Sequence, residues 1–569
     1  MRTITSDSVV SASIVGSVLF CFFSFAALAL TWEVGTDWGS FRDHAPILVS
    51  SAWGLLQQDS SEWNRYWMQL VAGGYRIDFI LHMSVPVSLC FALTITFCKM
   101  VYFSDECTQF AKHLSGPKLF TGKQAYLHAA KQLRADLAGG KHVGVSVHPK
   151  VTVSLEAETG NLVVMGQHGS GKSNLLKLLL LQIQSRGDKL LVFDDKPEYL
   201  KFLFDHKEAA LICAPDERSR TWTIAVDADT PETALMVVSQ LIHTDSADPL
   251  WTDGARLVLA SCICTLNATL KTAWGWPELS DALTWNHETL IRNIQEYYPA
   301  ASKTVVEGSR TTEGFLVTLT LRLSWVHTLA RLWPDRTHNP FSIKEWVNGE
   351  SPYKIIIIPN RSEYSALSKP LCAVFLSLMT AHVLSLPDSR TRRIWFCLDE
   401  FASLPKTPAI SDWLSKGRSK GARTLAGFQS FSQLEDIYGE KMAETLVSLF
   451  TNVAVLRCGS GGSSARKAAG IFGVRQVERP VVTVNSVGES STTYQRQEEP
   501  LVRAEDLIHL PQATRHGIEG YICLGGTNSV YRLRWPHPSI TNIAEEFVPS
   551  KRLVGQFNIK TNRRRKRNS

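Results

Sequence analysis

Hydrophobic residues follow two different patterns along this chain, and the change comes near residue 140. Two long apolar segments precede that point. After it, short runs rich in β-branched residues alternate with longer stretches of helical periodicity. The short runs predict buried strands at 162–165, 190–193, 354–358, 394–398, 424–427 and 453–456. Because strands alternate with helices, we expect an α/β fold with a mostly parallel, doubly wound sheet.

The two apolar segments are long enough to cross a membrane. Residues 9–30 contain no ionisable group except Cys21, and 22 residues in a helix span the roughly 30 Å hydrocarbon layer. The second segment, 79–97, is interrupted by His82 and Pro86. We predict transmembrane helices at about 9–31 and 79–99. A cleaved signal peptide is the alternative for the first, and a buried core helix for the second.

The distribution of basic residues predicts the orientation of these helices. The segment between them, 33–76, contains three arginines against five acidic residues, whereas four lysines follow within 99–123. Since basic residues stay on the cytoplasmic side, both termini are expected to face the cytoplasm. The tryptophan-rich loop at 33–76 would then lie outside it.

A phosphate-binding motif follows the first predicted strand. It reads G-x-x-x-x-G-K-S, with an apolar strand before it and a helix at 174–185 after it. The predicted nucleotide-binding residues are Gly166, Gln167, His168, Gly169, Ser170, Gly171, Lys172, Ser173 and Asn174. Lys172 is expected to contact the β- and γ-phosphates of ATP, and the Ser173 hydroxyl to coordinate Mg²⁺. The alternative is a glycine turn that binds no nucleotide.

Two carboxylates end the strand at 394–398. We expect Asp399 to complete the Mg²⁺ site with Ser173, and Glu400 to polarise the attacking water. Such a pair on its own usually marks a solvated turn. Together with the phosphate-binding motif it favours ATP hydrolysis, with ATP and Mg²⁺ as the ligands.

Polar residues around the next strand extend the catalytic hypothesis. Gln429 follows that strand and is expected to sense the γ-phosphate, while Arg418 precedes it and is our first candidate for an arginine finger acting on a neighbouring subunit. Arg457 is the second candidate. The alternative for either arginine is a simple ion pair with a surface carboxylate.

Charge and cysteine content narrow the possible functions. The eight basic residues after Glu546 outnumber the formal net charge of +7, so the rest of the chain is close to neutral. The 11 cysteines are scattered, which indicates neither a zinc finger nor a redox motif. Because the residues before the tail are close to neutral, the charge count excludes a strongly basic protein that binds nucleic acid over its whole surface.

These patterns divide the chain into segments. Strands are scarce between residues 230 and 332, where two apolar helices predict an all-α insertion. The polar segment 486–500 predicts a loop. The expected organisation is a membrane anchor at 1–103, a nucleotide-binding domain in two parts at 104–228 and 336–547, an all-α domain at 229–335 and a basic tail at 548–569.

Several longer segments resemble the TraD-type coupling proteins of conjugative type IV secretion. They are 248–251, 341–346, 398–405 and above all 427–439, which reads GFQSFSQLEDIYG. The resemblance implies a RecA-like ATPase domain, a homo-hexamer and a bacterial inner-membrane location. It also implies single-stranded DNA, carried by a relaxase within the relaxosome, and the inner-membrane components of the secretion channel as partners.

The resemblance implies an ATPase that translocates DNA. In it, the roles described above belong to Lys172, Ser173, Asp399, Glu400, Arg418 and Gln429. Longer relatives carry an acidic C-terminal extension that docks a relaxosome protein, whereas this sequence stops soon after its core and ends in RRRKRNS, which argues against docking by that route. One alternative is an ATP-dependent receptor that recruits protein substrates without pumping DNA. Another is a chromosome-partitioning pump of the FtsK type, for which we find neither further spans nor a winged-helix terminus.

Overall fold

A computed structural model describes residues 6–32, 39–57, 59–102, 112–242, 249–460, 463–484 and 490–553. The basic residues from Lys560 onward and Asp248 lie outside this range. The chain divides into two compact units. The first comprises Met1–His113 and Val477–Gln497, and the second comprises Leu114–Gln476 and Glu498–Ser569.

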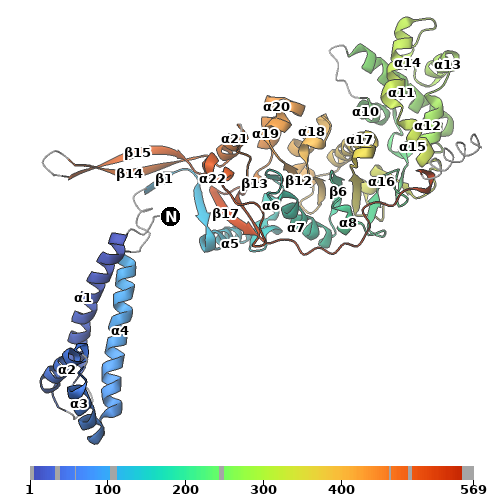
Figure 1. Ribbon diagram of the computed structural model, residues 1–569. Coiled ribbons are helices and arrows are strands. Elements are labelled where there is room, and N and C mark those ends of the chain that lie inside the picture. The colour runs from blue at the N-terminus through green and yellow to red at the C-terminus, as the bar shows by residue number, and fades with distance from the viewer. Residues whose placement is uncertain are drawn as a thin grey trace, which may run out of the picture. The chain divides into compact units, whose positions relative to one another are not determined.

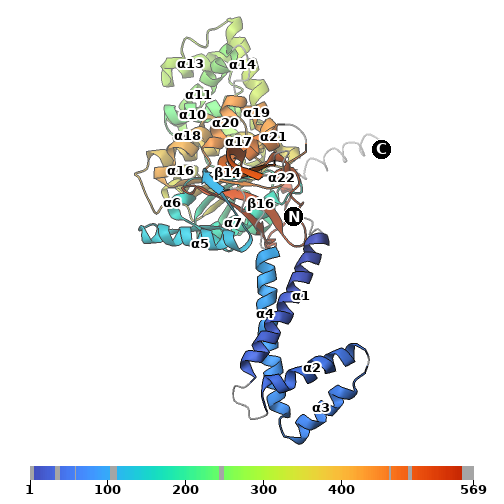
Figure 2. The same ribbon diagram turned by 90° about the vertical axis from the view of Figure 1, so that its left-hand side faces the viewer.

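The first unit contains two long helices that lie side by side (Figures 1 and 2). The predicted spans fall within α1 (Ser6–Thr31) and α4 (Arg76–Tyr102). Within α4, Arg76–Phe97 is long and apolar enough to cross a membrane, while the apolar part described in α1, Gly16–Thr31, is shorter. Large apolar side chains such as Phe22 and Leu89 are exposed on these helices, as expected for contact with lipid.

Two further helices occupy the segment between the spans, α2 (Phe41–Leu56) and α3 (Ser61–Ala72). A small aromatic core forms where α1 ends and α4 begins, centred on Trp32, Tyr66 and Phe79. The tryptophan-rich loop therefore has a helical structure of its own.

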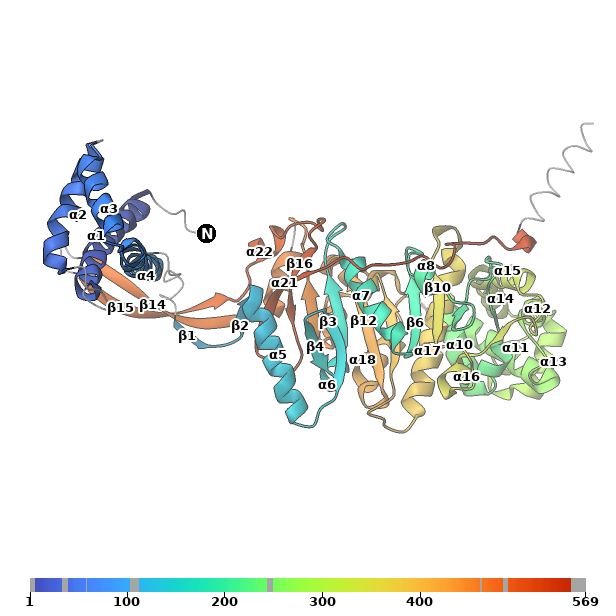
Figure 3. The same ribbon diagram turned by 90° about the horizontal axis from the view of Figure 1, so that it is seen from below.

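A ten-stranded sheet forms the centre of the second unit (Figure 3). In spatial order its strands are β2 (Lys118–Thr121), β17 (Ser529–Trp535), β16 (Ile518–Cys523), β13 (Asn452–Val455), β5 (Leu162–Met165), β12 (Ala422–Phe428), β11 (Ile394–Leu398), β6 (Lys189–Asp194), β10 (Ile355–Pro359) and β7 (Ala209–Leu211). All six strands predicted from the sequence belong to this sheet.

The seven strands from β13 to β7 are parallel, as predicted, while β16 is antiparallel to both β13 and β17. The sheet order separates β5, which leads into the phosphate-binding motif, from β11 by one strand, β12. Because parallel strands end at the same edge, the residues that follow β5, β12, β11 and β6 meet there.

Alternate residues of the central strands supply two separate cores. In β6, Leu191 and Phe193 pack into one core, whereas Leu190 and Val192 pack into the other. The second core is covered by α5 (Gly122–Ala138), α7 (Lys172–Ser185) and α8 (Leu200–Leu203). The first is covered by α16 (Ile343–Asn348), α17 (Ser365–Ser385), α18 (Pro408–Lys416), α19 (Phe431–Tyr438), α20 (Glu440–Ser448), α21 (Ser464–Ile471) and α22 (Ala504–Ile508). Helix α17 has the length and apolarity of a membrane span, but it is mostly buried against the sheet and is a core helix.

The described residues between Pro231 and Leu332 form helices and no strand. These helices are α10 (Pro231–Leu241), α11 (Leu250–Leu270), α12 (Trp276–Ala282), α13 (His287–Tyr297), α14 (Arg310–Leu323) and α15 (Val326–Leu332). The chain enters and leaves them at one place, because β8 (Thr221–Trp222) pairs with β9 (Pro340–Phe341). The buried carboxylate of Asp227, at the end of α9 (Ile224–Asp227), joins both ends: it accepts bonds from Trp222 Nε1 and Ser342 Oγ, each at 2.6 Å.

The remaining strands form two small sheets. Strands β3 (Val143–His148) and β4 (Val151–Ser154), with the short helix α6 (Leu155–Glu158) after them, flank α7. Strands β1 (Lys112–Ser115), β14 (Val474–Val484) and β15 (Ser490–Pro500) form a three-stranded sheet. The prediction of a loop at 486–500 is therefore wrong from Ser490 onward. Residues 486–489 lie outside the described residues. Strand β15 is polar throughout, so it carries no hydrophobic alternation that would predict a strand.

Candidate nucleotide-binding site

The phosphate-binding motif forms a tight turn between β5 and α7. Gly169 and Gly171 adopt φ angles of 78° and 97°, a left-handed conformation that favours glycine. A Cβ atom on Gly166 would lie 2.4 Å from Ser170 Oγ. Helix α7 then begins at Lys172, so its first backbone N–H groups point to the turn. This is the backbone arrangement that binds phosphate groups.

Lys172 connects the turn to the second predicted motif. Its Nζ donates to the backbone carbonyl of Asp399 at 2.8 Å and to Glu400 Oε2 at 2.9 Å. All three residues are largely buried. The two motifs, more than two hundred residues apart in sequence, thus form one polar cluster at the carboxyl edge of the sheet.

The residues predicted to hold Mg²⁺ are also in contact. Ser173 Oγ donates to Asp399, at 3.2 Å from Oδ1 and 3.4 Å from Oδ2. A hydroxyl and a carboxylate are oxygen ligands of the kind that Mg²⁺ binds in nucleotide sites. The pair therefore fits this ion in its chemistry and position.

A cavity of about 200 Å³ adjoins the cluster. Its lining residues come from the motif, the end of β12 and the turn after β6, namely Gln167, His168, Gly169, Gly171, Lys172, Ser173, Asn174, Lys196, Glu198 and Gln429. Gln429 thus faces the same space as Lys172. Among the described residues, the buried atoms Ser170 Oγ and Glu400 Oε1 have no hydrogen-bond partner. Both remain able to bond a phosphate or a water molecule.

Sequence reasoning missed the turn after β6, which contributes to the site. The Tyr199 hydroxyl donates to Asp399 Oδ1 at 2.7 Å, and Glu198 pairs with Lys177 of α7 at 2.5 Å. Burial, and then the charge of Asp399, raise the pKa of Tyr199 well above its usual value, so the hydroxyl keeps its proton. The available signal was a second apolar strand ending in acidic residues, Asp194 and Asp195.

Asp194 itself is a buried acid that stabilises this turn. It accepts hydrogen bonds from the backbone N–H groups of Glu198, Tyr199 and Leu200 at 3.2, 2.9 and 2.9 Å. Burial raises its pKa to about 7, against the opposing effect of these bonds. The side chain thus acts as a cap for the turn, while Tyr199 points to the nucleotide site.

The two candidate arginine fingers lie at opposite ends of the parallel strands, Arg418 at the amino ends and Arg457 at the carboxyl ends. Arg418 precedes β12 in a 3₁₀ turn, Arg418–Lys420, so it is remote from the nucleotide site of its own chain; its Nε donates to Thr159 Oγ1 at 3.1 Å. It lines a cavity of about 740 Å³ together with His142, Glu156, Arg390 and Lys416. Arg457 follows β13 and lies beside the phosphate-binding turn, where its carbonyl accepts from the Gln167 N–H at 2.9 Å.

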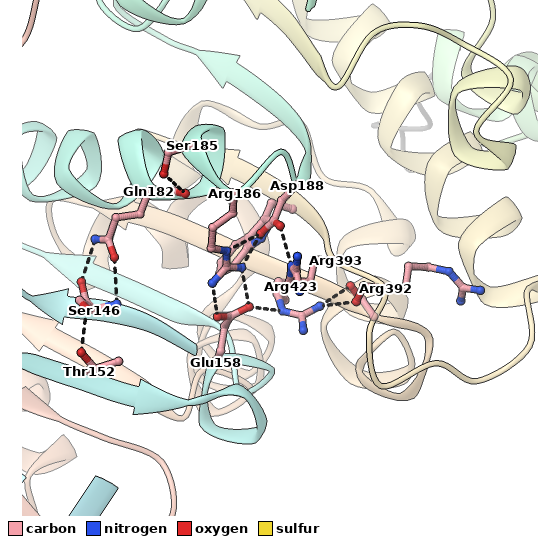
Figure 4. A network of polar contacts seen from close by, with 12 residues as sticks. Ser146, Thr152, Glu158, Gln182, Ser185, Arg186, Asp188, Arg392, Arg393 and Arg423 are labelled. Atoms are coloured by element: carbon pink, nitrogen blue, oxygen red, sulfur yellow. Dashed lines mark hydrogen bonds and ion pairs between the residues drawn. The ribbon is translucent and has the colours of Figure 1, made fainter. Parts of the chain in front are cut away.

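A network of charged residues connects Glu158, Arg186, Asp188 and Arg423 (Figure 4). Glu158 directly precedes Thr159, the hydrogen-bond partner of Arg418. Arg186, at the end of α7, donates two bonds to Glu158 at 2.8 and 3.0 Å and also pairs with Asp188. Arg423 of β12 pairs with the same Glu158, and Arg393, directly before β11, pairs with Asp188 at 2.6 Å. The network therefore fixes the edge that carries Arg418 to the helix that begins at the phosphate-binding turn.

Fold and site together define a RecA-like nucleotide-binding protein. The family model described as the type IV secretion-system coupling protein DNA-binding domain matches residues 145–534. The chain therefore belongs to the type IV secretion coupling protein family, in agreement with the resemblance seen in the sequence.

Individual relatives support this assignment. The coupling protein TraD of Escherichia coli strain K12 is 25% identical over 403 residues, which cover 69% of this chain and 55% of TraD. The chain thus spans about half of that relative's length. The conjugative coupling protein TrwB, in an unbound form that lacks its N-terminus, has 25% identity and a TM-score of 0.65; the match covers 77% of this chain and 97% of that chain. TrwB in complex with ADP and Mg²⁺ matches with 25% identity and a TM-score of 0.63, over the same shares of both chains.

Proposed function

We propose that this protein is an ATP-hydrolysing DNA translocase that links a relaxase–DNA complex to a type IV secretion channel at the bacterial inner membrane. The observation that carries the proposal is the contact of Lys172 and Ser173 with Asp399 and Glu400, beside a cavity that Gln429 also lines, in a chain whose family model is a DNA-binding domain. TrwB, a relative with the same fold, binds ADP with Mg²⁺ and a GTP analogue.

The site residues suggest how ATP is hydrolysed. Lys172 would move from Glu400 to the β- and γ-phosphates, because the phosphates offer it more negative charge than one carboxylate. Glu400 would then be free to accept a proton from the attacking water. Asp399 and Ser173 would hold Mg²⁺, which supplies charge neutralisation on the phosphate oxygens, and Gln429 would orient the water or sense the γ-phosphate.

The position of Arg418 favours an oligomeric ATPase. Because it lies at the sheet edge remote from its own nucleotide site, it can contact phosphate only in a neighbouring subunit. A homo-hexameric ring meets this requirement, with each Arg418 completing the site of the next chain. Helices α1 and α4 would anchor the ring by two transmembrane segments, with both termini and the ATPase domain in the cytoplasm.

The decisive experiment is a comparison of ATP hydrolysis with and without single-stranded DNA, using the full chain in detergent or nanodiscs. A DNA translocase should hydrolyse ATP faster when DNA is added, and the Glu400→Gln variant should show no stimulation. The second candidate function is a receptor that recruits protein substrates. Stimulation by a cargo protein, with no response to DNA, would favour the receptor and contradict the translocase.

A further inference from the structure

Among the described residues, the phenol of Tyr199 is the closest side-chain donor to the carboxylate of Asp399. Its hydroxyl lies 2.7 Å from Oδ1, whereas the Ser173 hydroxyl lies 3.2 Å from the same oxygen. Tyr199 is 1% exposed, so water does not compete for this bond. A neutral hydroxyl fixes the direction of a carboxylate and leaves its negative charge in place. A lysine or arginine in the same position would neutralise that charge.

The backbone that carries Tyr199 is itself fixed. The carboxylate of Asp194, 1% exposed, accepts the N–H groups of three successive residues from Glu198 to Leu200. On the other side of the turn, Asn360 at the end of β10 donates to Asp195 Oδ1 at 2.8 Å. Because both ends of the turn are bonded to strand ends, the phenol has little freedom to leave Asp399.

The bond to Oδ1 also restricts the orientation of the other carboxylate oxygen of Asp399, Oδ2. A carboxylate whose first oxygen is bonded at 2.7 Å presents Oδ2 in a single orientation. Metal-binding carboxylates depend on such supporting bonds, and their loss typically costs 10- to 100-fold in metal affinity or activity. Asp399 and Ser173 are the residues of this chain that fit Mg²⁺ in the proposed function.

We propose that Tyr199 is a positioning residue that holds the Asp399 carboxylate in the orientation needed to bind Mg²⁺ with the nucleotide. This inference rests on the proposed function of Asp399. The phenol does not line the nucleotide cavity and bonds Asp399 instead, so it would act through the carboxylate. Its contribution is therefore specific to the metal and leaves the phosphate contacts of Lys172 and the glycine turn unchanged.

The test is Tyr199→Phe, which removes one oxygen and keeps the ring. Binding of a fluorescent ADP analogue should be titrated with Mg²⁺, and separately measured in excess EDTA. The variant should need about 10- to 100-fold more Mg²⁺ for half-maximal metal-dependent binding, with unchanged affinity in EDTA. Mn²⁺ binding by electron paramagnetic resonance should weaken in parallel.

A matched control is Tyr531→Phe. Tyr531 belongs to β17, is also fully buried and lies far from the nucleotide site. Its hydroxyl bonds His128 Nδ1 at 3.1 Å. It should show wild-type Mg²⁺ dependence. Asp399→Asn should lose the Mg²⁺ dependence altogether, and the thermal midpoints of both tyrosine variants without nucleotide should be similar.

The outcomes separate this inference from the proposed function. If wild-type protein binds nucleotide with no dependence on Mg²⁺, the proposed role of Asp399 fails. If wild-type binding depends on Mg²⁺ and Tyr199→Phe titrates identically, Asp399 keeps its role and the positioning role of Tyr199 is wrong. An equal loss of affinity with Mg²⁺ and in EDTA would likewise overturn it, because it would show a general structural effect.

Discussion

The Nε atom of Arg423 lies 2.6 Å from Glu158 Oε1, and neither side chain is more than 1% exposed. Arg423 belongs to β12 and Glu158 to α6, so this pair connects two elements more than 250 residues apart in the chain. Arg423 also donates to the carbonyls of Gly421 and Arg392, each at 2.8 Å. The pair thus fixes the amino end of β12, directly after the turn that carries Arg418.

Breaking this pair should destabilise the protein severely. Arg423→Met leaves part of the Glu158 charge buried without its partner, and loss of one partner of a buried pair typically costs about 3–5 kcal/mol. The measurement is the midpoint of thermal or denaturant unfolding. Glu158→Gln combined with Arg423→Met should cost less than the two single effects together.

The control for this prediction is the exposed pair of Arg532 with Glu519. Arg532 is 44% exposed in its side chain, and such surface pairs contribute about 1 kcal/mol or less. Arg532→Met should therefore shift the midpoint far less than Arg423→Met. Equal shifts for the two variants would show that burial of the Glu158 network adds nothing.

The nucleotide site predicts two different losses of function. Lys172→Ala removes the contact with the phosphates, so nucleotide binding and hydrolysis should both be lost. Glu400→Gln keeps the shape of the side chain but removes the proton acceptor, so the variant should bind ATP while kcat falls by about 10²- to 10⁴-fold. Fluorescent nucleotide binding and phosphate release measure these effects. Wild-type hydrolysis by Glu400→Gln would contradict the role of this carboxylate.

The glycine turn allows a paired test of backbone geometry. Gly171→Ala should abolish nucleotide binding, because its φ is 97° and its Cβ would lie 2.6 Å from Ile518. Gly169→Ala meets nothing within 4 Å, and its φ of 78° makes the cost one of backbone strain, about 1–2 kcal/mol. Nucleotide affinity and unfolding midpoints should be measured for both. If both variants lose binding equally, the contact with Ile518 does not matter.

Much of the fold was predictable because its central strands are apolar on both faces. The six predicted strands all occur in the sheet, since residues such as Leu191 and Val192 are buried on opposite faces of β6. The strands that were missed lie at the two ends of the large sheet, where β2, β17 and β16 follow one another at one end and β7 closes the other, and in the small sheets. Strand β17 alternates buried and exposed residues over its second half, and β15 is polar, so its position depends on pairing with β14 rather than on a hydrophobic pattern.

The site was predictable where local motifs mark it and not where the sheet assembles it. The glycine turn and Asp399 are recognisable in sequence, and parallel strands bring them together. Tyr199 was missed because its role depends on β6 lying next to β11, which no local pattern reveals. The roles assigned to Arg418 and Gln429 stay predictions, as does a finger role for Arg457.

The arginine finger is tested by mixing variants. Arg418→Ala should lower kcat by about 10³-fold or more with little change in nucleotide affinity, because it removes a charge that acts on the adjacent subunit. Lys416→Ala is the control: Lys416 is exposed in the same region and pairs with Asp412. It should retain nearly wild-type activity.

Mixed rings separate a finger in trans from one in cis. When Arg418→Ala chains are combined with Glu400→Gln chains, some interfaces pair an intact Arg418 with an intact Glu400, and partial activity should return. Cross-linking or native mass spectrometry confirms that mixed rings form. No recovery in such rings would rule out action in trans.

The positive charge of the basic tail can attract two kinds of partner, nucleic acid and anionic lipid. Its eight basic residues after Glu546 attract nucleic-acid phosphates, and near a membrane each also attracts anionic lipid by about 1 kcal/mol. If the tail gathers DNA, deleting residues 560–569 removes six positive charges and should weaken single-strand binding. A variant of the same length, with these six residues changed to Gln, controls for chain length.

The salt dependence of DNA binding distinguishes the possible roles of this tail. If all six charges contact phosphate, the slope of log K against log salt concentration should fall by up to about 4 units, because each contact on a single strand contributes roughly 0.7. Basal ATPase activity should survive, since every candidate catalytic residue precedes Cys458. An unchanged slope with loss of binding to anionic liposomes would assign the tail to the membrane. No change in either measurement would leave solubility as its contribution, because a charged terminus that binds neither partner still opposes association between chains.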